Sequence, residues 1–232
     1  MAGSRGRAQA LIMAGLVYSD DRRFEKPGTQ VNPEIPLEVR GREYPWVSRG
    51  GVKLDHALSY FGIDVTGSTC LDVGASTGGF TDVLLSRGAS MVYAVDVGRG
   101  QLDWKLRQEE KVILLEKTNA RYLTKEDIPT PISFLVCDVS FINLRTVLPK
   151  SMELVSDGGY LVALIKPQFE VGKGLVGSGG IVSDPDQHKL VCDDIADWLS
   201  GCVGWCVKGV TSSPITGAKG NKEFLIAAHK SV

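Results

Sequence analysis

The stretch LDVGASTGGFTD, residues 71–82, decides the predicted fold of this 232-residue chain. An apolar strand runs there into a glycine-rich turn, and a predicted helix follows the turn. Glycines at 74, 78 and 79 permit positive φ and a close approach to a ligand, while the start of the helix presents unpaired N–H groups. A strand, turn and helix of this kind form the usual frame of a nucleotide-cofactor site, although the same elements also occur without a ligand.

The spacing of the glycines argues against a dinucleotide. A dinucleotide fingerprint reads G-x-G-x-x-G, whereas this chain reads G-x-x-x-G-G from Gly74. With Asp72 in the strand, the pattern resembles motif I of S-adenosylmethionine-dependent methyltransferases. A second apolar strand, 91–95, ends in Asp96, which is positioned to accept hydrogen bonds from both hydroxyls of a ribose. We expect cofactor contacts from Asp72, Gly74, Ser76, Gly78, Phe80, Asp96, Val97 and Asn119. For Asn119, an adenine contact and a loop cap both remain open.

The length allows one α/β domain of about 180 residues and a small appendage. No apolar run approaches the roughly 20 residues of a membrane-spanning helix, and the first residues lack the apolar core of a signal peptide. The five cysteines are scattered and form no C-x-x-C pair, which favours reduced, buried thiols over a zinc site. We therefore expect a cytoplasmic protein without a membrane segment.

The amino-terminal part of the chain is basic. Residues 1–53 hold nine Lys/Arg and six Asp/Glu, and the remainder is net acidic. The order S-R-x-x-A-x-x-L-I-x-x-G-x-V from Ser4, followed by Lys26-Pro27-Gly28, resembles the second half of an S4-type RNA-binding domain whose first half is missing here. We expect a partial S4-like domain at 1–45 and a catalytic domain at 46–232. A short structural arm is the competing interpretation of the first segment.

After residue 46 the pattern alternates between strand and helix, as a doubly wound α/β fold requires. The last two predicted strands have no helix between them, which suggests an antiparallel hairpin. The sequence thus predicts a Rossmann-like, seven-stranded sheet with a small amino-terminal α+β appendage. The predicted strands lie near 69–73, 91–96, 112–116, 133–138, 160–165, 205–212 and 223–229, and the predicted helices near 9–16, 51–61, 79–87, 100–109, 142–155 and 185–199.

Charged residues sit at the ends of several predicted strands. Asp138 and Lys166 each follow an apolar strand, and Glu223 opens the last one. In an open α/β sheet the ligand lies beyond the carboxyl ends of the strands, so these residues are candidates for a site. Strands also stop at polar residues for no functional reason, and a buried ion-pair network is the structural alternative.

Together with Lys53, these residues give the chain order K-D-K-E. The set resembles the tetrad of FtsJ-like RNA 2′-O-ribose methyltransferases. The run from Trp46 to Leu54 and the S4-like start are similar to the hemolysin-A family of ribosomal RNA methyltransferases. This resemblance covers nearly the whole chain, and it implies methyl transfer from S-adenosylmethionine to a cytidine 2′-hydroxyl of ribosomal RNA, free or in ribosomal subunits.

The chemistry suits these residue types. A ribose hydroxyl is a very weak acid and needs a base aligned behind it. A lysine can serve only as the neutral amine, which burial and a second cation favour. We assign Lys166 as the base, Asp138 as the carboxylate that orients the lysines and steadies the sulfonium region, and Lys53 and Glu223 as the outer pair. Such a cluster requires no metal.

Three other functions compete with this interpretation, and the first is methyl transfer to an RNA base or a protein amine. Methyltransferases that act on exocyclic amines often carry an N/D-P-P-Y/F loop after the fourth strand, and this chain has Asp138-Val139-Ser140-Phe141 there. A catalytically inactive RNA-binding protein remains possible. The hemolysin name suggests a pore, which the lack of an apolar span argues against. The sequence leaves the modified nucleotide, the ribosomal subunit and the oligomeric state open.

Overall fold

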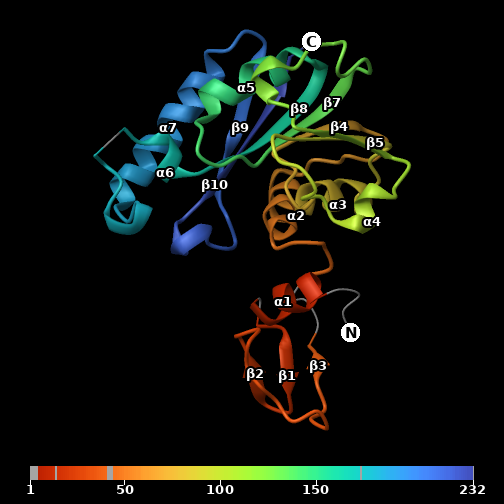
Figure 1. Ribbon diagram of the computed structural model, residues 1–232. Helices are drawn as coiled ribbons and strands as arrows, with labels where there is room; N and C mark the ends of the chain where they lie inside the picture. Colours follow the sequence, from red (N-terminus) through yellow and green to blue (C-terminus); the bar gives the residue numbers. More distant parts are fainter. Residues whose placement is uncertain (1–4, 14, 41–43, 173, 232) are drawn as a thin grey trace. The chain divides into compact units, whose positions relative to one another are not determined.

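The computed structural model describes residues 5–13, 15–40, 44–172 and 174–231. The chain divides into two compact units, Met1–Pro45 and Trp46–Val232 (Figure 1). The second unit contains all of the predicted cofactor and catalytic residues.

The first unit combines one helix with a small antiparallel sheet. Strand β1 lies between β2 and β3, and Val17 of β1 pairs with Phe24 of β2. Both side chains are buried, so they supply the apolar contact between these short strands. The elements are α1 (Arg5–Met13), β1 (Val17–Ser19), β2 (Arg22–Phe24) and β3 (Glu38–Val39).

Two details of the first unit differ from the predictions. Helix α1 begins at Arg5, whereas the predicted helix spans 9–16. Strand β2 (Arg22–Phe24) has no counterpart among the predicted strands. Its two arginines, Arg22 and Arg23, are exposed and only Phe24 is buried, so this edge strand lacks the apolar run by which strands are found in a sequence.

The second unit is built on a seven-stranded sheet of order β6-β5-β4-β7-β8-β10-β9. The strands are parallel except β10, which is antiparallel to both of its neighbours. The predicted fold class is confirmed. The strands are β4 (Thr69–Val73), β5 (Met91–Asp96), β6 (Val112–Glu116), β7 (Ile132–Cys137), β8 (Val155–Ile165), β9 (Trp205–Ser212) and β10 (Phe224–Lys230).

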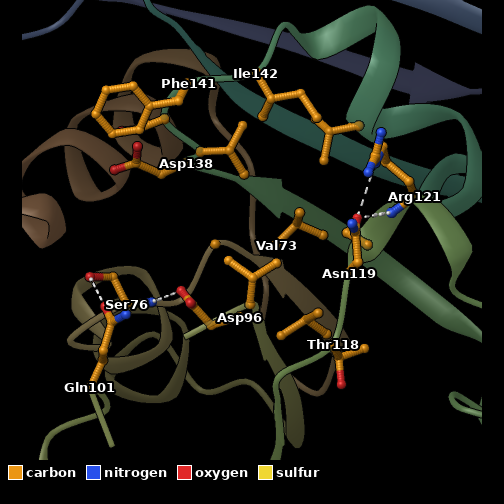
Figure 2. Close-up of a pocket in the computed structure, with 17 residues that line it drawn as sticks. Val73, Ser76, Asp96, Gln101, Thr118, Asn119, Arg121, Asp138, Phe141 and Ile142 are labelled. Carbon is orange, nitrogen blue, oxygen red and sulfur yellow. Dashed lines mark hydrogen bonds between the residues drawn. The ribbon is translucent and has the colours of Figure 1, made fainter. Parts of the chain in front are cut away.

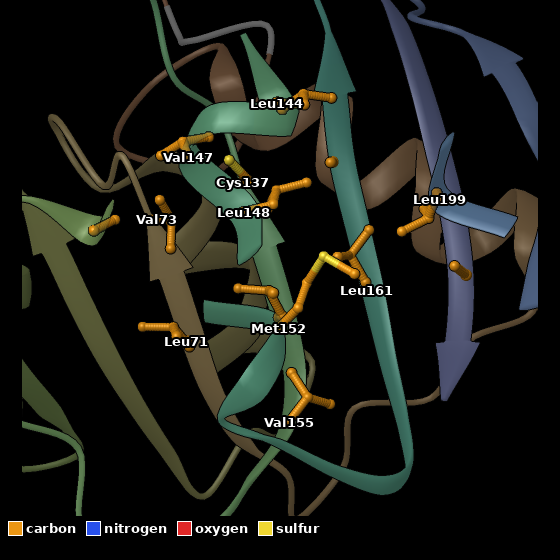
Figure 3. Close-up of a cluster of buried hydrophobic side chains, with 14 of the residues drawn as sticks. Leu71, Val73, Cys137, Leu144, Val147, Leu148, Met152, Val155, Leu161 and Leu199 are labelled. Carbon is orange, nitrogen blue, oxygen red and sulfur yellow. The ribbon is translucent and has the colours of Figure 1, made fainter. Parts of the chain in front are cut away.

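Helices cover both faces of this sheet (Figure 1). Helices α5 and α7 pack on one face through Leu148, Met152 and Leu199, which lie against Leu71 and Leu161 of the strands (Figure 3). Helices α2 and α3 pack on the other face. The helices of this unit are α2 (Gly50–Phe61), α3 (Gly79–Ser86), α4 (Trp104–Arg107), α5 (Leu144–Glu153), α6 (Pro167–Glu170) and α7 (Pro185–Ser200), with short 3-10 turns η1 (Ala120–Tyr122), η2 (Ser178–Gly180) and η3 (Ala218–Gly220). None of the helices in the described ranges is long and apolar enough to cross a membrane.

Two predicted boundaries in this unit are wrong. The helix predicted at 100–109 is a single turn, α4, because Asp103 caps it by accepting a hydrogen bond from the Lys105 backbone N–H at 3.0 Å, and the residues before the cap form a loop. Strand β8 begins at Val155, not at 160. It continues through Gly158 and Gly159, and glycines inside a strand weaken its signal in the sequence.

The topology also fixes where a ligand can bind. Strands β5 and β6 follow β4 toward one side of the sheet, whereas β7 and β8 lie on the other side of β4. The direction in which the chain adds strands therefore reverses between the neighbours β4 and β7. Loops that leave two such strands run in opposite directions and open a crevice at the carboxyl edge of the sheet. The loops that follow β4, β5, β7 and β8 at this edge carry most of the predicted site.

Candidate active site

A cavity of about 410 Å³ lies at this edge, among the loops that follow β4, β5, β6 and β7 (Figure 2). Five of the predicted cofactor residues line the cavity. These are Gly74, Ser76, Asp96, Val97 and Asn119. Gln101, Thr118 and Arg121 also line it, and no sequence pattern singled them out.

The glycine turn is required by close packing. Gly74 has a φ of 86°, and a Cβ atom at this position would lie 2.3 Å from the backbone oxygen of Asp138. Gly78 has a φ of 96°, and its Cβ would lie 2.2 Å from Leu106 Cδ1. Gly74 therefore lets the loops after β4 and β7 meet at the cavity. Gly78 instead lets α4 pack beneath the turn, and it lines neither cavity of the site.

Asp96 holds the loops after β4 and β5 together. Its Oδ2 accepts a hydrogen bond from the Ser76 backbone N–H at 2.8 Å (Figure 2). Its Oδ1 accepts one from the Gly98 N–H at 2.7 Å. Each carboxylate oxygen has a further lone pair. The carboxylate is thus fixed in place and can still accept hydrogen bonds from a diol in the cavity.

Asn119 caps the short turn η1. Its Oδ1 accepts hydrogen bonds from the backbone N–H of Arg121 at 3.1 Å and from Arg121 Nε at 3.3 Å (Figure 2). The residue therefore has the cap role that the sequence left open, and it also borders the cavity. The two roles are compatible because the cap uses only the amide oxygen.

Asp72 lies beneath the glycine turn and not in the cavity wall. It is fully buried, and its Oδ2 accepts a hydrogen bond from Thr81 Oγ1 at 2.7 Å. Its Oδ1 has no hydrogen-bond partner among the described residues. Burial raises the pKa of the Asp72 carboxyl to about 7, and the nearby charges of Asp138 and Asp96 add to the rise.

A second cavity of about 230 Å³ adjoins the first, since Gly74, Ser76, Asp138 and Ser140 line both. Lys53 and Lys166 also line the second cavity, as does Phe80, whose side chain is buried. Glu223 lines neither cavity. The predicted catalytic residues come from α2, the loops after β7 and β8, and the start of β10.

The structure arranges these four residues as two ion pairs. Lys53 Nζ lies 2.5 Å from Glu223 Oε2, and both side chains are buried. Lys166 Nζ lies 2.5 Å from Asp138 Oδ1 and donates a hydrogen bond to Ser140 Oγ at 3.0 Å. The Lys166–Asp138 contact lacks the angles of a hydrogen bond, so Asp138 Oδ1 remains without such a partner in the described part of the chain. Ser140 was not predicted, although it lies two residues after Asp138.

The loop after β7 is held by the segment after β8. Glu170 Oε1 accepts a hydrogen bond from the Leu144 backbone N–H at 3.0 Å, and the rings of Phe141 and Phe169 lie 5.0 Å apart. Burial raises the pKa of the Glu170 carboxyl to about 7. With the Lys166–Asp138 pair, these contacts fasten both ends of the loop that forms one wall of each cavity.

The described residues contain no group of three or more His, Cys, Asp or Glu side chains that could hold a metal ion. The donors gathered here are lysine nitrogens and single carboxylates, and they form two ion pairs. The arrangement can hold a polar ligand against the Asp96 carboxylate and can move a proton at Lys166. Both the ligand at Asp96 and the proton at Lys166 would lie beside the loop after β7, which lines both cavities.

Comparison with known proteins identifies the class. Residues 46–230 match the model of the FtsJ-like methyltransferase family, and the chain belongs to this family. A 16S/23S rRNA (cytidine-2′-O)-methyltransferase, TlyA of Mycobacterium tuberculosis, is 48% identical over 97% of this chain and 84% of its own length.

Two further proteins are similar over nearly the whole chain. Hemolysin A of Brachyspira hyodysenteriae is 40% identical over 96% of this chain and 92% of its own length. A solved structure from Streptococcus thermophilus, of a protein predicted to be a hemolysin, has a TM-score of 0.82 at 43% identity and covers 98% of this chain and 83% of its own. The family that the sequence motifs indicated is confirmed, and the chain is a methyltransferase.

Proposed function

We propose that this methyltransferase transfers a methyl group from S-adenosylmethionine to the 2′-hydroxyl of a cytidine in ribosomal RNA. The observation that carries the proposal is the Lys166–Asp138 pair, which stands at the wall shared by the two cavities. A hydroxyl acceptor needs a base at this point, and an amine acceptor does not. The name of the M. tuberculosis relative supports the choice of ribosomal RNA and of cytidine.

The larger cavity suits S-adenosylmethionine. The Asp96 carboxylate, held by two backbone N–H groups, would accept hydrogen bonds from the ribose hydroxyls of the cofactor. Val97 and Asn119 would lie along its adenosine, while Gly74 and Ser76 would face it from the turn. Asp72, Gly78 and Phe80 would support the turn from below. When bound, the cofactor supplies a methyl group activated by a sulfonium.

The protein's own residues would handle the proton. Lys166 would take it from the ribose hydroxyl, and Asp138 and Ser140 would keep the lysine nitrogen in place. Asp138 lines both cavities, and its charge would also steady the sulfonium. The Lys53–Glu223 pair, buried beside them, would hold α2 against the start of β10.

We further propose that Met1–Pro45 is a partial S4-like domain that contributes to RNA binding, and that the protein works in the cytoplasm, where its substrate is found. Arg22 and Arg23 on β2 are exposed. Replacing both with glutamine should weaken RNA binding and flatten its salt dependence, because each lysine or arginine on a phosphate adds to that dependence. Cofactor affinity should not change.

The direct test is incubation with methyl-labelled S-adenosylmethionine and unmethylated ribosomal subunits, followed by mapping of the labelled nucleotide. A ribose 2′-O-methyl group blocks alkaline cleavage of the adjoining phosphodiester, so label on the ribose should appear in an alkali-resistant dinucleotide. Label in a mononucleotide would point to a base instead. Binding of RNA without any label would make the protein an inactive binder and would refute the proposal.

A further inference from the structure

The charges around the smaller cavity do not balance. Lys53 is paired with Glu223, and Lys166 is paired with Asp138. Arg49 lines the same cavity, and in the ranges that the structure describes its guanidinium makes no ion pair, hydrogen bond or ring contact. The cavity wall therefore carries one uncompensated positive charge beside two neutralised pairs.

The position of Arg49 follows from the start of α2. Arg49 precedes the helix as its N-cap residue, and its side chain caps no backbone group. Lys53 comes four residues later, so the two side chains lie on the same side of the helix, and both reach the cavity wall. The fold thus places an exposed guanidinium beside a buried lysine at the reacting edge.

Two other cations near the cavities are already engaged. Arg121, in the wall of the larger cavity, bonds to Asn119 at 3.3 Å. Lys105, on the adjoining α4, pairs with Asp82 at 2.8 Å. Arg49 differs from both because its donors are free to bind an incoming ligand.

We propose that Arg49 binds the phosphodiester on the 3′ side of the target nucleotide. This inference rests on the proposed function. A ribose that presents its 2′-hydroxyl to Lys166 carries its 3′-phosphate on the neighbouring carbon, so the phosphate enters the same cavity as the hydroxyl. One phosphate neutralises the one surplus charge. A guanidinium also matches a phosphate with two parallel N–H···O hydrogen bonds.

The test is Arg49→Gln, with methylation of ribosomal subunits measured at several monovalent salt concentrations and fixed magnesium. KM for the subunits should rise about ten-fold or more, the cost of one charge-assisted contact. The slope of log affinity against log salt should fall by about 0.7, the value for one phosphate contact on a single strand. We expect kcat to stay within about three-fold, because Arg49 has no part in the proton transfer.

Two further variants sharpen the test. Arg49→Lys retains the charge and should keep the salt slope, while it recovers only part of the affinity because it loses the paired hydrogen bonds. Lys111→Gln is the matched control, since Lys111 is exposed and precedes β6 at the opposite edge of the sheet. It should leave KM, kcat and the salt slope unchanged. Calorimetry with S-adenosylmethionine verifies that each variant is folded.

The outcomes separate this inference from the proposed function. If the unaltered protein methylates no RNA, the proposed function fails and the Arg49 assignment falls with it. If the unaltered protein is active and Arg49→Gln leaves KM and the salt slope unchanged, only the Arg49 assignment is overturned. A fall in kcat at constant KM would also overturn it, because phosphate binding would not produce that pattern.

Discussion

The two lysine–carboxylate pairs of this protein have the same length and different surroundings. In the Lys53–Glu223 pair, 8% of the lysine side chain and 3% of the glutamate side chain are exposed. In the Lys166–Asp138 pair the values are 10% and 21%, and Asp138 lines both cavities. Both ammonium groups lie in confined positions, but only one of them is paired with a carboxylate that a ligand can touch.

This difference assigns the pairs to different tasks. The Lys53–Glu223 pair has a carboxylate that lines neither cavity, and we expect its main effect to be on stability, since removing either partner leaves a buried charge. A pair at a cavity wall can be reorganised when a ligand arrives. We therefore expect substitutions at Lys166 to act on the reaction and substitutions at Glu223 to act on folding.

The largest expected effect is that of Lys166→Arg on the reaction. Arginine keeps the positive charge, but it does not lose its proton at any working pH, and its planar group cannot replace a compact amine. Single-turnover methylation should fall by about 100-fold or more, the usual contribution of a general base. Cofactor affinity should persist, because the predicted adenosine contacts come from other loops. Lys150→Arg, the same change at an exposed lysine, is the control, and near-normal turnover in Lys166→Arg would exclude Lys166 as the base.

The second expected effect concerns stability. Glu223→Ala should lower the free energy of unfolding by about 3 kcal/mol, because it leaves Lys53 charged and buried. Asp138→Ala should lower the free energy of unfolding by less, because water in the adjoining cavities can reach Lys166 after it loses its partner. Urea unfolding of both variants measures the difference. Equal losses of unfolding free energy in the two variants would show that exposure does not distinguish the pairs. The double variant Lys53→Met with Glu223→Leu removes both charges, so it should recover much of the stability that Glu223→Ala loses.

Lys53 and Glu223 were expected as an outer pair, and the structure pairs them. Asp138 was expected to orient both lysines, but its ion pair in the structure is with Lys166. Parallel strands bring their carboxyl ends to one edge, so Asp138 and Lys166 could be expected near each other. Which lysine meets which carboxylate depends on side-chain positions in three dimensions. The pairing of Lys53 with Glu223, 170 residues away, has no local signal, and neither has the role of Ser140.

Prediction of the fold from the sequence is limited in the same way. Strands β4, β5 and β6 were predicted with their observed bounds because each is an apolar run that ends at a glycine or a charged residue. The helix predicted at 100–109 and the start of β8 were wrong because caps and sheet pairing, and not apolar periodicity, set those boundaries. Arg49 was overlooked because an exposed arginine is unremarkable until its neighbours are known to be paired.

A smaller effect, on binding, tests whether the cofactor cavity is independent of the two pairs. Asp96→Ala should weaken the binding of S-adenosylmethionine by about 1.5–3 kcal/mol, through loss of charge-assisted hydrogen bonds to the ribose. Part of the loss will come from the Ser76 and Gly98 backbone contacts. Asp96→Asn retains one acceptor oxygen and should lose less. Calorimetry is the measurement, and unchanged affinity in Asp96→Ala would place the ribose elsewhere.

The last expected effect depends on pH and concerns Asp72, a buried carboxylate that is paired with no lysine of the described ranges. Its pKa of about 7 in the folded protein exceeds the ordinary value of 3.8, so between about pH 4 and pH 7 the folded state holds a proton that the unfolded state has lost. Stability from this residue is therefore complete below about pH 4 and falls as the pH rises through 7, by at most about 1.4 kcal/mol per pH unit.

In Asp72→Asn the amide still accepts the Thr81 hydrogen bond but does not titrate. Urea unfolding at pH 5, 6, 7 and 8 should show the unaltered protein losing its advantage over this variant as the pH rises, while the exposed control Asp197→Asn keeps a constant offset. A constant offset for Asp72→Asn as well would mean that the folded-state pKa of Asp72 does not lie between about 5 and 8.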